Sequence, residues 1–201
     1  MKMNLLGGTM SIQKIKEVSL KLFSQNGYDG TSLSDISNGV GINKSTIYAH
    51  FKNKESIFLA VFDDALWDYN IHVEKLIEEI KNDPIEEKLF KILCDVSHYY
   101  TKNEDKKLFL RRSVLFPPAF LLEELMTRIA TTDEALVKTL CSIFEEGIKE
   151  GIIQPGNIKD LVNSYLCVLD GLFTNAYYLY DENFSNRAQN IWKIFWKGIR
   201  V

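Results

Sequence analysis

The apolar residues of this chain recur with the period of an α-helix almost throughout its 201 residues. No segment keeps the strict alternation of apolar and polar residues that a half-buried strand requires. The pattern therefore predicts an all-α protein. We expect helices over residues 11–26, 33–40, 44–51, 54–82 (in one or two pieces), 85–102, 105–116, 119–130, 135–150, 158–180 and 185–199.

Several helix ends are marked by local chemistry. Gly27 follows the first helix and suits the left-handed position after a helix end. Ser32 and Asp35 have the spacing of a capping box, in which the side chain of each residue accepts a hydrogen bond from the backbone amide of the other. Pro117 and Pro118 break a helix that resumes afterwards. Other expected N-terminal caps are Asn43, Asn53, Asp83 and Thr131.

Charge is distributed unevenly along the chain. The formal net charge is −3, yet residues 1–54 hold seven lysines against three acidic residues, so this segment carries +4 and the remainder −7. A basic segment on an acidic body indicates a local contact with a polyanion. No apolar run is long enough for a membrane span, and the first ten residues lack the features of a secretory signal. We therefore expect a cytoplasmic protein without a membrane partner.

The three cysteines, Cys94, Cys141 and Cys167, are far apart in helical segments with apolar neighbours. Their spacing matches no metal site, and an odd number argues against a disulfide framework. We interpret them as small buried hydrophobic residues, with a redox sensor as the alternative. The sequence predicts neither a bound metal nor a cofactor.

The segment INKSTIYAHFKNKE, residues 42–55, contains a short helix with two different faces. At 100° per residue, Ile47 and Phe51 point together toward a core. The rest of the helix presents groups that can approach a phosphate or a base edge in the major groove of DNA: Lys44, Ser45, Thr46, Tyr48 and His50. With the preceding helix it forms a helix-turn-helix. The alternative is a surface helix with a polar face and no ligand.

The run LFSQNGYDGTSLSDISNGVGINKSTIYAHFKNKESIF resembles the N-terminal DNA-binding domain of TetR-family transcriptional regulators, over roughly residues 12–62. Ser32 stands where this family usually has a second threonine. By similarity, the positions expected to contact phosphates are Thr31, Ser32, Tyr48 and Lys54. The positions expected on the recognition helix are Lys44, Ser45, Thr46 and His50.

The resemblance implies two domains and a homodimer. A helix-turn-helix domain over residues 1–54, including a ten-residue extension, precedes a helical ligand-binding and dimerisation domain over residues 55–201. The last two helices of such regulators form the dimer interface, and here both are unusually apolar for the surface of a monomer. The expected interface residues are Leu166, Phe173, Tyr177, Trp192, Phe195 and Trp196.

Aromatic residues are frequent in the middle helices, where they could form an apolar pocket with a few polar groups. Such a stripe is also what an ordinary core contains, so both interpretations stay open. The candidate ligand-binding residues are Phe62, Trp67, His98, Tyr99, Phe109, Phe116, Tyr165, Leu169 and Phe173.

These features predict a ligand-responsive repressor that binds a palindromic DNA operator as a homodimer and is released by a small-molecule effector. The rival classes are a helical protein-interaction adaptor without DNA binding and an enzyme. The sequence lacks a nucleophile elbow, a glycine-rich phosphate loop and a zinc-protease motif, which disfavours an enzyme.

Overall fold

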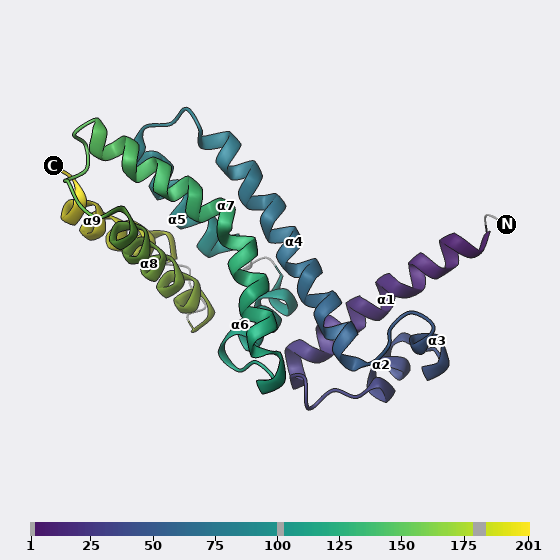
Figure 1. The fold of residues 1–201 in the computed structure, drawn as a ribbon. Coiled ribbons are helices and arrows are strands. Elements are labelled where there is room, and N and C mark those ends of the chain that lie inside the picture. The colour runs from purple at the N-terminus through teal and green to yellow at the C-terminus, as the bar shows by residue number, and fades with distance from the viewer. Residues whose placement is uncertain (1–2, 100–102, 179–183) are drawn as a thin grey trace. The chain divides into compact units, whose positions relative to one another are not determined.

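The computed structural model describes residues 3–99, 103–178 and 184–201, except for the side chains of residues 3–10 and 176–178. The described chain is helical, as predicted, and its one extended pairing is an isolated bridge between Ile153 and Arg200. The helices, labelled in Figure 1, are α1 Met3–Asn26, α2 Leu33–Val40, α3 Lys44–Tyr48, α4 Lys54–Ile80, α5 Ile85–His98, α6 Glu104–Leu115, α7 Leu122–Lys149, α8 Ile158–Tyr178 and α9 Phe184–Ile199, with a 3₁₀ turn over Ala119–Leu121.

The chain forms two compact units. The first comprises Met1–Asp68 and Asn103–Thr131, and the second comprises Tyr69–Lys102 and Thr132–Val201. Both units are therefore assembled from two separate stretches of sequence. The functional division after residue 54 remains a prediction, because compactness alone does not assign a function to either unit.

The first unit is built around α1, which packs along α6 and against α2, while α2 also packs on α3. Figure 1 shows α2 and α3 together beside α1. An aromatic cluster joins the helices: the ring of Phe58 in α4 lies edge-on to Phe23 of α1 at 5.1 Å and to Phe109 of α6 at 5.2 Å. All three rings are buried. Edge-to-face contacts of this kind add to the hydrophobic stabilisation of the core.

The second unit has its core where α5 packs against α8 and α9. Tyr165 of α8 is completely buried, and its hydroxyl donates to the carbonyl oxygen of Leu89 in α5 at 2.6 Å. The ring of Phe195 in α9 lies edge-on to Tyr165 at 5.9 Å, so α8 and α9 meet, as Figure 1 also shows. A buried phenol needs such a hydrogen-bond partner, because an unpaired hydroxyl in the core is costly.

Most predicted helix ends are confirmed. Ser32 caps α2 through the expected capping box with Asp35. Gly27 has φ +75°, a left-handed conformation that an L side chain rarely adopts. The side chain of Asn53 accepts a hydrogen bond from the amide of Ser56 at 2.8 Å at the start of α4.

Three local predictions were wrong. Asn43 makes no side-chain cap at α3. Pro84, rather than Asp83, occupies the cap position of α5, and Asp83 instead accepts a hydrogen bond from Lys91 at 2.8 Å. The helix expected to end at residue 130 continues without a break through α7. Its candidate cap Thr131 donates to the carbonyl oxygen of Thr127 at 2.9 Å, four residues earlier in the same helix.

Candidate nucleic-acid interface and ligand clefts

The helix-turn-helix is formed by α2 and α3. Gly41 ends α2 with φ +78°, and its amide donates to carbonyl oxygens of the last turn of that helix. This left-handed residue turns the chain so that α3 packs on α2. Ile36 and Ile47 are fully buried and Val40 nearly so, which fixes one face of α3 against the core of the first unit.

The opposite face of α3 points to solvent. Lys44, Ser45 and Tyr48 are exposed, whereas Thr46 and His50 are half-buried. The helix ends at Tyr48 instead of residue 51, so His50 lies two residues beyond it and not on the recognition helix as expected. Tyr48 keeps 57% of its surface exposed. The side chains of these five residues make no hydrogen bond to any other described residue, so their donors and acceptors remain available to a ligand.

Ser32 is exposed at the start of α2, but its hydroxyl already takes part in the capping box. Its Oγ accepts from the amide of Asp35 at 3.1 Å and donates to the Asp35 carboxylate at 2.6 Å. The hydrogen bonds from Ser32 lower the pKa of Asp35, and the positive charge of Lys44 contributes less. The start of α2 therefore carries a fixed negative charge beside the surface of α3.

Thr31 corrects a sequence-based expectation. Its side chain is 1% exposed, and its hydroxyl lies 2.8 Å from the carbonyl oxygen of Gly27 and 3.2 Å from that of Leu22. A hydroxyl buried in this way cannot contact a phosphate from its side chain. Thr31 instead holds the connection between α1 and α2 in place.

Lys54 begins α4, as expected, but its ammonium is turned toward the connection between α1 and α2. It donates to the carbonyl oxygen of Tyr28 at 2.7 Å and lies 4.0 Å from the centroid of the Tyr28 ring. Burial, followed by the charges of Glu55 and Asp29, raises the pKa of Tyr28.

Lys52, which the prediction did not include, is exposed in the loop between α3 and α4. Its charge is the only feature of the sequence that could have identified it as a candidate DNA contact.

Four of the candidate ligand-binding residues line clefts. Phe109 and Phe116 line a cleft of about 260 Å³ in the first unit, and Trp67 lines another of about 330 Å³ in the same unit. His98 lines a cleft of about 610 Å³ in the second unit, bounded by α5, the end of α4 and the start of α9. The nine candidates are thus not gathered around one cavity.

The other candidates line none of these three clefts. Phe62, Tyr165 and Leu169 are buried in the cores of their units. Phe173 is half-buried in α8. Tyr99 stacks on the ring of His72 at 4.2 Å, and His72 in turn contacts the carboxylate of Asp95. For Tyr165 and Phe62, packing already explains the position of the ring.

The predicted dimer residues differ in their exposure. Trp192 and Trp196 are 5% and 6% exposed and stack on each other with ring centroids 5.5 Å apart, so they belong mainly to the core of the second unit. Leu166, Phe173 and Phe195 are half-buried, and the side chain of Tyr177 lies outside the described residues. The large apolar side chain that α9 does expose is Ile194, at 77%.

The cysteines are less buried than predicted. Cys94 and Cys141 are half-buried, and Cys167 is exposed on α8. Burial, with a smaller contribution from Asp95, raises the pKa of the Cys94 thiol to about 11. That thiol stays protonated near neutral pH, and a protonated thiol is a poor nucleophile.

Long-range polar contacts in the first unit were not predicted. Arg112 of α6 donates from Nη1 to the carbonyl oxygens of Gln25 at 2.8 Å and Ser24 at 3.1 Å, at the end of α1. Lys16 of α1 pairs with Asp64 of α4 at 2.8 Å. Only the charge of these residues was visible in the sequence, because their partners are 48 to 88 positions away.

The described residues contain neither a metal site nor a membrane-spanning helix. No group of three or more histidine, cysteine or acidic side chains is placed so that it could hold a metal ion. None of the helices in the described part of the chain combines the length and apolar character that a membrane crossing requires.

The helix-turn-helix segment is similar to a known family. Residues 15–61 match the family described as bacterial regulatory proteins, tetR family. The negative transcriptional regulator IcaR of the biofilm operon icaADBC in Staphylococcus epidermidis is 36% identical over 93 residues, which cover 44% of this chain and 49% of that protein. The chain thus matches about half the length of this curated relative.

Solved structures extend the similarity to nearly the whole chain. FadR of Bacillus subtilis, in complex with stearoyl-CoA, is 20% identical with a TM-score of 0.73, covering 93% of this chain and 98% of its own. AibR, in complex with isovaleryl coenzyme A and operator DNA, is 19% identical with a TM-score of 0.69, covering 92% and 97%. At these identities the likeness shows the fold alone.

A helix-turn-helix that exposes a polar recognition surface at the start of an all-α chain defines a class of DNA-binding proteins. Within that class, residues 15–61 match the tetR family of bacterial regulatory proteins, so this part of the chain is a tetR-type DNA-binding domain.

Proposed function

We propose that the protein is a transcriptional repressor that binds a palindromic operator as a homodimer and is released from it by a small molecule. The observation that carries the proposal is the two-faced structure of α3. Ile47 anchors the helix in the core, while Lys44, Ser45 and Tyr48 are exposed and their side chains make no hydrogen bonds to the described residues. Repression is supported by the similarity to IcaR, a negative regulator.

DNA binding follows from the dimensions and chemistry of α3. The major groove accepts a helix, and small side chains such as that of Ser45 let its backbone approach the bases. Lys44 meets the phosphates at one end of the helix, and the Tyr48 phenol donates to a phosphate oxygen at its side. Thr46 and His50 complete the base-facing set. Phosphate contacts fix the position of the protein, and base contacts select the sequence.

Dimerisation is proposed through the faces of α8 and α9 that the core of the second unit leaves uncovered. Ile194 on α9 and Cys167 on α8 are exposed members of these faces. A two-fold dimer presents two copies of α3, and its operator therefore has two related half-sites about one helical turn, roughly 34 Å, apart or a multiple of that distance.

An effector is proposed because a regulator of this fold is switched when a ligand binds one conformation better than another. The proposal is supported by FadR and AibR, whose structures were solved with acyl-CoA molecules. A coupling free energy of about 1 to 3 kcal/mol changes DNA affinity roughly 5- to 150-fold. No enzymatic activity is proposed, since the similar proteins are regulators.

DNA binding is tested by fluorescence anisotropy with labelled DNA from upstream of the protein's own gene, in the presence of unlabelled random DNA. We expect specific binding whose logarithmic affinity falls linearly with the logarithm of salt concentration, by about 0.9 for each phosphate neutralised. Equal affinity for upstream and random DNA would reject sequence-specific regulation at that site.

A pair of variants tests whether α3 makes the contact with DNA. The variant Ser45→Tyr places a large side chain on the face that approaches the bases, and it should abolish specific binding without changing the melting temperature. Ser142→Tyr, on an exposed position of α7, is the matched control. If both variants bound the upstream DNA as the unmodified protein does, α3 would not be the recognition helix.

A further inference from the structure

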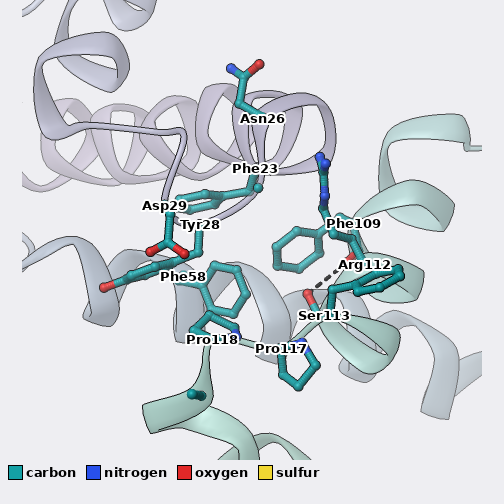
Figure 2. A pocket seen from close by; sticks show the side chains of 13 residues that line it. Phe23, Asn26, Tyr28, Asp29, Phe58, Phe109, Arg112, Ser113, Pro117 and Pro118 are labelled. Atoms are coloured by element: carbon teal, nitrogen blue, oxygen red, sulfur yellow. Dashed lines mark hydrogen bonds between the residues drawn. The ribbon is translucent and has the colours of Figure 1, made fainter.

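A cleft in the first unit lies where α1, α4 and α6 converge. Figure 2 shows the rings of Phe23, Phe58 and Phe109, one from each helix, at its wall, with Pro117 and Pro118 on another side. Its volume is about 260 Å³. All of these residues belong to the unit that also contains the helix-turn-helix, and none of them is part of the exposed face of α3.

The cleft contains one cation with unused hydrogen-bonding capacity. The Nη1 group of Arg112 donates to the carbonyl oxygens of Ser24 and Gln25, whereas its Nε and Nη2 groups make no hydrogen bond to a described residue. A guanidinium has five N–H donors in a planar fork that fits a carboxylate. The carbonyls at the end of α1 have no partner within the helix, so Arg112 satisfies groups that would otherwise face solvent.

We propose that this cleft binds a small aromatic carboxylate, with the aromatic ring against the exposed ring of Phe116 and the half-buried rings of Pro117 and Pro118, and with the carboxylate on Arg112. Aromatic walls favour a planar apolar body, which gains offset-stacked and edge-to-face contacts. The volume suits a compound with a single ring. Asp29 also lines the cleft and disfavours a doubly charged group, so a monoanion fits better than a phosphate ester.

Binding has a consequence for the contact between α6 and α1. A carboxylate on Nε and Nη2 pulls the guanidinium into the cleft and draws Nη1 away from the two α1 carbonyl oxygens, because bonds to an anion are stronger than bonds to a neutral carbonyl. Loss of that contact loosens α6 from α1, and α1 packs directly on α2 of the helix-turn-helix. The ligand therefore weakens DNA binding. This regulatory step rests on the proposed function, whereas the binding site itself does not.

Calorimetric titration of the full chain without DNA tests the site. The probes are phenylacetate and its neutral analogue phenylacetamide. We expect phenylacetate to bind roughly tenfold or more tightly than the amide, and Arg112→Gln to remove this preference. Because Arg112→Gln also removes the contact with α1, its folding is checked by thermal unfolding.

A second variant avoids that complication. Ala119 is exposed and lines the cleft, so Ala119→Phe fills the space without disturbing the core, and it should weaken phenylacetate binding roughly tenfold or more. Ala130→Phe, at an exposed position of α7 outside the cleft, is the matched control and should bind normally. Equal binding by both variants, or no binding by the unmodified protein, overturns the proposed site.

The same protein is then titrated with operator DNA in the presence and absence of phenylacetate. If phenylacetate weakens DNA binding by the unmodified protein but not by Ala119→Phe, the regulatory step is supported. If phenylacetate leaves the DNA affinity of the unmodified protein unchanged, the regulatory step is overturned. If the protein binds phenylacetate in this way but binds no DNA, the site stands and the proposed function fails. If the protein binds DNA but not phenylacetate, the proposed function stands and the proposed site fails.

Discussion

The ammonium of Lys54 is hydrogen-bonded to the carbonyl oxygen of Tyr28 at 2.7 Å and lies over the ring of the same residue. One side chain of α4 thus holds the connection between α1 and α2 by a charged hydrogen bond and a cation–π contact. The amino group already has partners within the protein in the absence of DNA. A substitution of Lys54 should therefore affect the stability of the fold.

Lys54→Gln should therefore act on stability more than on phosphate contacts. We expect the free energy of unfolding to fall by about 1.5 to 3 kcal/mol, since a hydrogen bond from a charged donor contributes that much. DNA affinity should fall with it, while its dependence on salt stays nearly constant. Urea unfolding and anisotropy at several salt concentrations measure the two effects. A salt slope smaller by about 0.9 would identify Lys54 as a direct phosphate contact instead.

Lys44→Ala should show the opposite pattern. Lys44 is exposed at the start of α3 and its side chain makes no hydrogen bond to a described residue, so its removal should leave the melting temperature unchanged. The loss of one phosphate contact should lower the salt slope by about 0.9 and weaken binding to all DNA sequences by a similar factor. Lys75→Ala, at an exposed position of the second unit, is the matched control. A slope equal to that of the control would exclude Lys44 from the phosphate contacts.

Asp133 in α7 should make the stability depend on pH. Burial, followed by the charge of Asp170, raises the pKa of its carboxyl from 3.8 to about 6. The folded protein therefore holds a proton that the unfolded chain has already lost. The stabilisation from the neutral form is complete below the unfolded pKa and is lost as pH rises through the folded pKa.

Asp133→Asn keeps the side chain neutral at every pH. It should raise the free energy of unfolding at about pH 7.5 by roughly 2 to 3 kcal/mol and have little effect at about pH 4. Chemical unfolding at the two pH values measures the difference, with the exposed substitution Glu150→Gln as the control. An equal gain at both pH values would contradict a raised pKa at Asp133.

Ile194→Asp should separate dimerisation from folding. Ile194 is 77% exposed in α9, so the substitution costs the isolated chain little, whereas a two-fold interface would contain it twice. We expect a folded monomer by sedimentation velocity. Val201→Asp, also at a 77% exposed position, should leave the dimer intact. A dimer that survives Ile194→Asp would place the interface on another surface.

Trp196→Asp should behave differently from Ile194→Asp. Trp196 is 6% exposed and stacked on Trp192, so a carboxylate at this position would be buried without a partner. We expect loss of folding, seen as a lowered melting temperature or insoluble protein. A folded monomer from Trp196→Asp would show that this side chain serves the interface rather than the core.

Features that depend on neighbouring residues were predicted from the sequence. The capping box of Ser32 and Asp35 and the left-handed Gly27 each follow from chemistry within four positions. The same local signals failed where a longer helix competed with them. Thr131 has the spacing of a cap, but its hydroxyl bonds within α7, because helix packing outweighs a weak capping preference.

Contacts between distant residues could not be predicted. The sequence shows Arg112 as an exposed charge in a helix and gives no sign that it binds the end of α1, 87 positions away. It also assigned Thr31 to the DNA surface, whereas the fold buries its hydroxyl. Burial and partner choice arise only when segments far apart in sequence meet, and a periodic pattern identifies the buried face but not what covers it.

The short helix α3 is attached to the body of the protein through a single fully buried side chain, Ile47. The positions beside it contribute almost nothing to the stability of the fold, so their chemistry is unconstrained by packing. Duplicated copies of such a gene can diverge at the exposed positions Lys44, Ser45 and Tyr48 and acquire new operators without passing through unfolded intermediates. The operator sequence of the proposed repressor is thus a property that evolution or an engineer can exchange while the scaffold stays unchanged.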